Sequence, residues 1–202
     1  MNIGGIFESF DLTSLKLVTY GTEPMPENLL INLKSKLPMT RFNQTFGTSE
    51  TGIIKTKSES STSLLLKFED ENQLVKIVNN ELWIKSKTKI LGYINHNDDS
   101  FTIDGWFKTG DLVENEGNGY YKIVGRKSKI INVGGEKVFP IEIESTILKL
   151  DYILDCTVYG KNNSITGQTV TARVVIESID IDIKQLKKNI KIHCKKYLER
   201  YK

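Results

Sequence analysis

The sequence predicts a mixed α/β and α+β fold, because three differently patterned regions follow one another along the chain. Residues 1–52 contain an alternating apolar and polar segment, a leucine pattern at helical spacing and a short extended segment. Residues 64–125 contain several short β segments separated by turn signals. After Gly125, strand and helix patterns alternate, and the last of them is a long amphipathic helix.

The first region is typical of a strand–helix–strand unit at the edge of an α/β sheet. We expect strands at Leu15–Tyr20 and Arg41–Thr45, and a helix that begins near Pro24–Glu27, where proline is tolerated in the first turn. The helix is indicated by the spacing of Leu29, Leu30, Leu33 and Leu37. We expect Gly47 to interrupt the chain after the second strand.

The middle region predicts a small β-barrel or meander. Asn79 and Asn80 are a hairpin signal between strands at Leu74–Val78 and Leu82–Lys85, and Glu116–Gly119 is a second turn. The further strands are expected at Phe101–Ile103, Trp106–Lys108 and Tyr120–Val124.

The last region predicts a small α+β domain, with a boundary near Arg126–Ser128. The elements expected, in chain order, are a strand at Lys129–Val133, a turn at Gly134 and Gly135, a helix at Pro140–Leu150, strands at Ile153–Tyr159 and Thr169–Glu177, and a helix at Asp182–Lys202.

Composition excludes several classes of protein. The chain has 202 residues with 28 Lys and Arg against 25 Asp and Glu, so its net charge of +3 gives no reason to expect nucleic acid or an anionic membrane as a partner. The lysines of 184–202 are typical of a solvated helix face. No apolar stretch approaches the ~20 residues of a transmembrane helix. Cys156 and Cys194 do not have the spacing of a metal site, and we expect a cytoplasmic location.

Four short motifs occur in a fixed order: Gly21–Pro24, Asn43–Gly52, Trp106–Asp111, and a run from Gly119 through Arg126 to Glu144. Together they resemble the adenylate-forming superfamily, which includes acyl-CoA synthetases, peptide-synthetase adenylation domains and luciferases. The resemblance extends over nearly the whole chain. It implies an ATP-dependent enzyme that converts a small carboxylic acid into an acyl-AMP and then passes the acyl group to a thiol.

The resemblance also implies a domain organisation. Residues 1–126 would be the end of a large N-terminal domain, with an α/β piece at 1–52 and a β-barrel-like subdomain at 53–126. Residues 127–202 would be the small mobile α+β domain. Ser128, between Lys127 and Lys129, stands where the family has a hinge Asp or Lys. A few residues can absorb such a rotation without a special side chain, so we still expect a hinge.

Within the second motif, Glu50 stands at the position of a glutamate that contacts Mg²⁺, an ion that takes a few carboxylate or phosphate oxygens and keeps its waters. Ser49 replaces the usual threonine, and its hydroxyl can still donate to the α-phosphate. Phe46 replaces the usual tyrosine and keeps a ring face for adenine. The resemblance therefore assigns the catalytic roles in this chain to Glu50 and Ser49.

Asp111 matches an aspartate that accepts hydrogen bonds from the ribose hydroxyls, a task that suits an acceptor-only carboxylate. Arg126 matches an arginine near the ribose, just before the hinge. Gly134 and Gly135 resemble a loop that turns toward the thiol acceptor. The remaining contacts to ATP, AMP or the acyl group are assigned to Gly21, Thr22, Glu23, Pro24, Asn43, Gly47, Thr48 and Ile123.

Two family features are missing from the 202 residues. No glycine-rich phosphate loop precedes Gly21, and Lys202, which we expect to end a helix, lacks the preceding glycine of the family's catalytic lysine. Loss of one such electrostatic contact costs about 10²–10³ in rate. We therefore expect this chain to be the C-terminal portion of a ligase, inactive without the missing N-terminal part of the same polypeptide.

Three alternatives compete with a CoA ligase. The residues of Ile131–Val138 are more similar to acyl-CoA synthetases, which favours CoA as the thiol. The first alternative is an adenylation domain that loads the phosphopantetheine of a carrier protein, and the second is a non-catalytic remnant that binds AMP or a partner protein. A plain α+β interaction module is the third. The sequence does not indicate which acid is activated or the oligomeric state.

Overall fold

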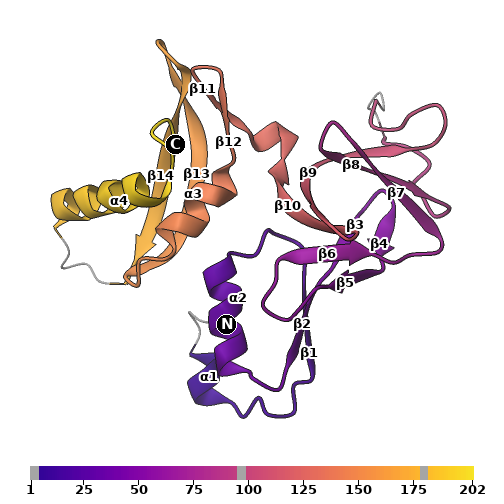
Figure 1. Ribbon diagram of the computed structural model, residues 1–202, viewed down its shortest axis with the longest axis horizontal. Coiled ribbons are helices and arrows are strands. Elements are labelled where there is room, and N and C mark those ends of the chain that lie inside the picture. Colours follow the sequence, from indigo (N-terminus) through magenta and orange to yellow (C-terminus); the bar gives the residue numbers. More distant parts are fainter. Residues whose placement is uncertain (1–4, 95–98, 178–181) are drawn as a thin grey trace. The chain divides into compact units, whose positions relative to one another are not determined.

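The computed structural model describes residues 5–94, 99–177 and 182–202 (Figure 1). The chain forms two compact units, one of residues 11–127 and one of residues 128–202 together with 5–10. Both contain helices and sheets, which confirms the mixed fold class. The assignment of residues 1–126 to a larger domain and of 127–202 to a mobile one stays a prediction. Among the described residues, no helix has the length and apolar character needed to cross a membrane.

The strand–helix–strand unit is confirmed. Strands β1 (Leu17–Tyr20) and β2 (Arg41–Gln44) pair in parallel, and helix α2 (Glu27–Lys36) connects them. Parallel strands need such a crossover, because a tight turn can only join antiparallel neighbours. Pro26 is the N-cap of α2, and the leucine pattern places Leu30, Leu33 and Leu37 in the interior.

The expectation that Gly47 interrupts the chain is wrong. Gly47 lies within β3 (Phe46–Thr48), which pairs with β4 (Gly52–Ile54) in an antiparallel hairpin. A Cβ atom at Gly47 would lie 2.9 Å from the Cα of Ile53. Glycine is needed here because the two backbones approach closely, and glycine in a strand often marks such an approach.

The β-rich region forms a six-stranded sheet of antiparallel pairs in the order β5-β6-β10-β9-β8-β7. Its strands are β5 (Thr56–Ser58), β6 (Leu65–Phe68), β7 (Gln73–Val78), β8 (Glu81–Ser86), β9 (Phe107–Gly117) and β10 (Tyr120–Arg126). The core of this unit contains Phe46, Ile54, Leu82, Ile84 and Val113.

Both predicted turns are present. Asn79 and Asn80 have positive φ angles of 51° and 65°, as a two-residue hairpin turn requires, and Asn118 and Gly119 turn the chain between β9 and β10.

The strand expected at Phe101–Ile103 is not formed. Only Phe101 makes an isolated bridge, to Phe107, and the residues between them turn. The Thr102 hydroxyl donates to Asp104 and accepts from the Trp106 N–H, at 2.6 and 2.9 Å. These local side-chain hydrogen bonds compete with strand pairing.

The C-terminal unit contains a four-stranded sheet, in the order β12-β11-β14-β13, and the helices α3 and α4. Its elements are a 3₁₀ turn at Lys127–Lys129, β11 (Ile131–Val133), β12 (Glu136–Val138), α3 (Pro140–Ile147), β13 (Ile153–Asn163), β14 (Gly167–Ile176) and α4 (Ile183–Tyr197), with the short α1 (Ile6–Ser9) at the start of the chain. The turn at Gly134 and Gly135 lies where it was expected, between β11 and β12.

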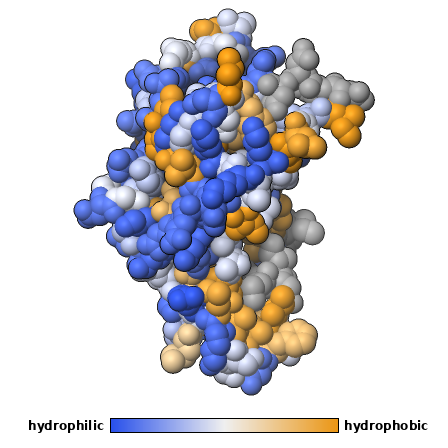
Figure 2. All heavy atoms as spheres, turned by 90° about the vertical axis from the view of Figure 1, so that its right-hand side faces the viewer, coloured by the Kyte–Doolittle hydropathy of each residue, from blue (hydrophilic) through white to orange (hydrophobic). Residues whose placement is uncertain are grey.

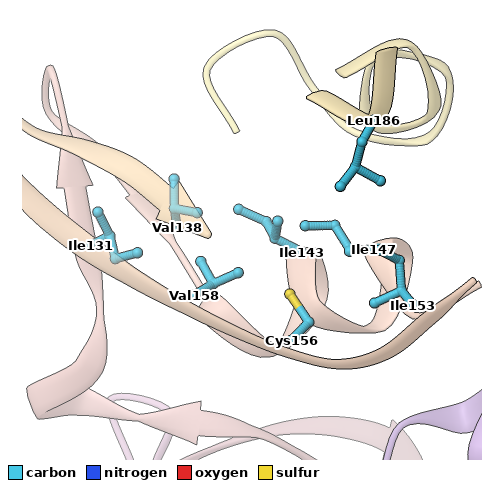
Figure 3. Close-up of a cluster of buried hydrophobic side chains, with 8 residues drawn as sticks. All are labelled: Ile131, Val138, Ile143, Ile147, Ile153, Cys156, Val158 and Leu186. Carbon is cyan, nitrogen blue, oxygen red and sulfur yellow. The ribbon is translucent and has the colours of Figure 1, made fainter. Parts of the chain in front are cut away.

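Buried side chains from both helices and the sheet form the core of this unit (Figure 3). The cluster contains Ile131, Val138, Ile143, Ile147, Ile153, Cys156, Val158 and Leu186. Burial raises the pKa of the Cys156 thiol to about 12, so it stays protonated and acts as a small apolar residue.

The last helix is shorter than expected. It begins after its N-cap Asp182, whose carboxylate accepts from the Lys184 N–H at 3.0 Å, and it ends at Tyr197. The prediction that Lys202 ends this helix is wrong. Leu198 is extended and packs against the core, and Lys202 pairs with Glu142 of α3 at 2.7 Å, so the chain turns back onto its own unit.

The surface is mixed, and apolar side chains are scattered between hydrophilic ones over the face drawn in Figure 2. Exposed apolar residues include Phe10, Ile31, Met39, Ile53 and Ile103. The lysines on α4, among them Lys184, Lys187, Lys188, Lys191 and Lys195, are exposed, as expected of a solvated helix face.

Replacement of Ile147 by Ala tests this core. Ile147 is 1% exposed, so the cavity left behind should lower the free energy of unfolding by about 2–5 kcal/mol. Urea denaturation measures the change. Ile183→Ala is the matched control, because that isoleucine is 63% exposed and should change stability by less than about 0.5 kcal/mol. Equal effects of the two substitutions would contradict the core assignment.

Candidate functional site

The parallel pair β1–β2 brings the first two motifs together. Gly21 follows β1 and Thr45 follows β2, and the Thr45 N–H donates to the Tyr20 carbonyl oxygen at 2.7 Å. A Cβ atom on Gly21 would lie 2.0 Å from the Thr45 carbonyl oxygen, so only glycine fits. Ligands of α/β sheets bind beyond the carboxyl ends of parallel strands, which is where these two loops meet.

The loop after Gly21 lies on the surface. Thr22, Glu23 and Pro24 are exposed, and none of them belongs to a helix or strand. Their expected place in the adenine and acyl pocket stays a prediction.

A tight turn between β3 and β4 presents Ser49 and Glu50. The Thr48 hydroxyl accepts from the Thr51 N–H at 3.1 Å and forms a second hydrogen bond with the buried Thr51 hydroxyl at 2.9 Å. Ser49 is exposed and Glu50 is half-buried. Thr48 therefore holds the turn that carries the two candidate catalytic side chains.

Glu50 is also held from a distant segment. The Tyr93 hydroxyl donates to Glu50 Oε1 at 2.5 Å, and the Ile90 N–H donates to the Glu50 carbonyl oxygen at 2.9 Å. Sequence reasoning missed Tyr93, because one tyrosine in an irregular segment has no pattern, and its neighbour Gly92 is the one local signal of a turn there.

Two predicted nucleotide contacts have packing roles in the structure. Asn43 Oδ1 accepts from the Ser58 N–H at 3.0 Å, which ties β2 to β5. Phe46 is buried in the core, and its ring meets Phe68 edge-on at 6.0 Å between centroids. This burial does not favour a stacked adenine on Phe46, and both nucleotide roles stay predictions. Gly47, beside it, is exposed.

Asp111 and Arg126 face each other across the β9–β10 pair. They are direct partners in the strand register, and Arg126 Nε donates to Asp111 Oδ1 at 2.9 Å. The Asp111 carboxylate is buried, while the Arg126 side chain is 58% exposed. Burial raises the pKa of Asp111, and the Arg126 charge opposes that rise. A further hydrogen-bond donor would stabilise the anionic form of the Asp111 carboxylate. Ile123, also on β10, packs against the core opposite Val113.

Sequence reasoning also missed Glu81, the first residue of β8. Its carboxylate is buried and accepts from the Gly110 N–H at 3.1 Å, directly beside Asp111. An isolated glutamate after a turn is ordinarily solvated, so only the tertiary contact identifies it.

Gly134 and Gly135 belong to the other compact unit. Both have positive φ angles, 60° and 97°, and the Gly134 N–H donates to the Thr166 carbonyl oxygen at 2.9 Å. They form a fixed hairpin turn, and their role toward a thiol acceptor stays a prediction.

No group of three or more His, Cys, Asp and Glu side chains gathers in the described part of the chain. A cage made only of protein ligands is therefore not found there. The single Glu50 carboxylate fits Mg²⁺, because that ion is commonly bound through one or two carboxylates plus substrate phosphates and waters.

Comparisons with known proteins agree with the motifs. Residues 142–202 match the family model of the AMP-binding enzyme C-terminal domain. Acyl-CoA synthetase 7 of Caenorhabditis elegans is 31% identical over 212 residues, which cover 98% of this chain and 39% of that protein. A long-chain-fatty-acid–CoA ligase of Yersinia pestis is 33% identical over 144 residues, 70% of this chain and 25% of that protein.

The fold is shared with solved structures of longer chains. A crystal structure of an anthranilate CoA ligase in complex with anthranoyl-AMP superimposes with a TM-score of 0.81 at 24% identity, covering 97% of this chain and 41% of that one. The present chain thus spans about two fifths of that protein and 39% of the nematode synthetase.

Replacement of Arg126 by Met tests the charge pairing. It removes the cation beside a buried carboxylate and should destabilise the fold by about 1–3 kcal/mol at neutral pH, a moderate loss because the arginine is exposed. The pKa of Asp111, already raised, should rise further. The loss in the free energy of unfolding caused by the substitution should therefore become smaller as the pH falls through that pKa and Asp111 becomes neutral.

Urea denaturation between pH 4 and pH 8 measures this dependence. Asp111→Asn in the Arg126→Met background should recover part of the lost stability, because no charge is left unpaired. A penalty independent of pH, with no recovery in the double variant, would show that the loss comes from packing of the arginine stem.

Proposed function

We infer the function from one premise: the chain belongs to the adenylate-forming superfamily of AMP-binding enzymes. Named relatives in this superfamily include CoA ligases, so an AMP-forming ligase is the class of enzyme to which the chain contributes. We propose that it is part of an ATP-dependent acid–thiol ligase, which activates a carboxylic acid as acyl-AMP and transfers the acyl group to CoA.

The buried Asp111 carboxylate supports this proposal most directly. It has one cationic partner, Arg126, and a pKa raised by burial, so its anionic form lacks the hydrogen bonds that water would supply. A carboxylate is acceptor-only and can take two hydroxyl groups at once. A ribose, with its adjacent hydroxyls, is the ligand that meets this need in an AMP-binding enzyme.

In the adenylation step, a carboxylate oxygen of the acid bonds to the α-phosphorus of ATP, and the bond to pyrophosphate breaks. We assign Ser49 to donate to the α-phosphate, since it is exposed at the tip of the turn fixed by Thr48. Glu50, oriented by Tyr93, would hold Mg²⁺, which when bound supplies positive charge to the phosphates.

In the thiol step, the sulfur bonds to the acyl carbon and AMP leaves. Gly21–Pro24 is assigned to the adenine and acyl pocket, where its exposed loop meets the end of β2. Gly134 and Gly135 are assigned to the approach of the thiol, because a turn without side chains lets a narrow pantetheine group pass close to backbone.

The nature of the thiol is decided by product analysis. The polypeptide that carries these 202 residues should convert ATP, a carboxylic acid and CoA into AMP, pyrophosphate and acyl-CoA, detected by mass spectrometry. A panel of acids of different chain length identifies the substrate. If the acyl group is transferred only to a carrier protein, the acceptor is the phosphopantetheine of that protein and not CoA. AMP binding without pyrophosphate release would make the chain a nucleotide-binding remnant.

Glu50→Gln tests the assignment of the phosphate site. The substitution keeps the shape of the side chain but removes its charge, and it should lower kcat for acyl-AMP formation by about 10²-fold, the usual size of one lost electrostatic contact. Pyrophosphate exchange measures the rate. Glu116→Gln is the control, because Glu116 is exposed near the end of β9 and should leave the rate unchanged. A normal rate in Glu50→Gln would remove this residue from the site.

A further inference from the structure

The strand that carries Asp111 is bulged at Thr109–Asp111. Glu81 of β8 pairs with Leu112 of β9, and Trp83 pairs with Lys108. Between these two pairs β8 has only Leu82, whereas β9 has Thr109, Gly110 and Asp111. Bulges disrupt the ladder locally and re-aim side chains, and they are common beside active sites. Asp111, the last of these three residues, is paired with Arg126 in the register of β9 with β10.

The amides of a bulge need partners outside the ladder, because a buried and unpaired N–H is costly. Two side chains supply them. The Thr109 hydroxyl donates to the Leu82 carbonyl oxygen at 2.7 Å and accepts from the Asp111 N–H at 3.0 Å. Glu81 Oε1 accepts from the Gly110 N–H at 3.1 Å. Gly110 has a φ angle of 73°, so the bulge also needs glycine at this position.

A glutamate is an unusual acceptor for the Gly110 N–H, because the Glu81 side chain is only 10% exposed and a buried charge is costly unless it is paired. Its second oxygen, Oε2, pairs with Lys127 Nζ at 3.3 Å. That lysine is 69% exposed, so solvent screens the pair and its contribution is small. The contact to the Gly110 N–H is therefore the stronger of the two.

We propose that Glu81 is a positioning residue of the nucleotide site: it supports the bulge at Thr109–Asp111 that presents the Asp111 carboxylate, and it links this bulge to Lys127, next to Arg126. The inference rests on the proposed function, since it gives Glu81 a role through Asp111. Each carboxylate has a cationic partner, and the two cations, Arg126 and Lys127, are neighbours in sequence.

The test compares Glu81→Ala with Glu81→Gln in the polypeptide that carries this chain. Alanine removes the acceptor of the Gly110 N–H, and the dissociation constant for AMP, measured by calorimetry, should rise about 10-fold. Glutamine keeps an acceptor of the same length and should stay within about 3-fold of wild type. Lys127→Met should also change the dissociation constant for AMP only slightly, because the lysine is exposed.

Gln73→Ala is the matched structural control. Gln73 is a buried polar residue on β7, and it donates to the Ile53 carbonyl oxygen at 3.1 Å, away from the bulge. The Gln73→Ala substitution should lower the free energy of unfolding without changing the affinity for AMP. If Glu81→Ala behaves in the same way, with loss of stability and unchanged AMP affinity, Glu81 is a structural residue and the proposal is overturned.

Amide hydrogen exchange separates this proposal from the proposed function. Exchange at Gly110 and Asp111 should accelerate in Glu81→Ala and stay slow in Glu81→Gln and Gln73→Ala. If Asp111→Asn leaves AMP affinity unchanged, the nucleotide role of Asp111 fails, and with it any role of Glu81 in binding. Slow exchange at Gly110 in Glu81→Ala would instead refute the support of the bulge, whatever the nucleotide role of Asp111.

Discussion

The pairing of β9 with both of its neighbours is the constraint on which the candidate site depends. Register with β10 sets Asp111 opposite Arg126, and the shifted register with β8 creates the bulge that Glu81 supports. A register slip of one residue would turn every side chain of the strand to the other face of the sheet. The site is therefore built from positions along strands, with loops added at their ends.

The buried carboxylates of this site are only partly compensated by cations. Asp111 and Glu81 are both buried, and each has one exposed cation as its partner, Arg126 or Lys127. Exposed cations keep most of their hydration, so they stabilise the buried anions only in part. Burial accordingly raises the pKa of Asp111. A site of this kind has unused capacity to accept hydrogen bonds, which a ligand with hydroxyl groups can fill.

The two compact units differ in how they use their residues. In the C-terminal unit, α3 and α4 bury aliphatic side chains against the sheet, and even Cys156 serves as packing (Figure 3). In the unit of residues 11–127, the polar residues of the motifs lie along strands, as Asp111 does, or in the loops and turns at their ends, and Gly21 and Gly47 allow close backbone approach. Both glycines follow from sterics, because a Cβ atom at either would overlap neighbouring backbone.

The sequence by itself determined the local structure: the helix of Leu30 and Leu33, the Asn79–Asn80 hairpin and the motifs that identify the superfamily. These depend on periodicity, turn chemistry and short spacings, all of which lie within a few residues. The end of the last helix at Tyr197, the strand through Gly47 and the burial of Phe46 and Glu81 were decided only by the tertiary structure. The strand through Gly47 needs a partner strand that no periodicity indicates. The other features depend on contacts between residues far apart in the chain, such as Glu81 with Gly110, whose free energy no local pattern contains.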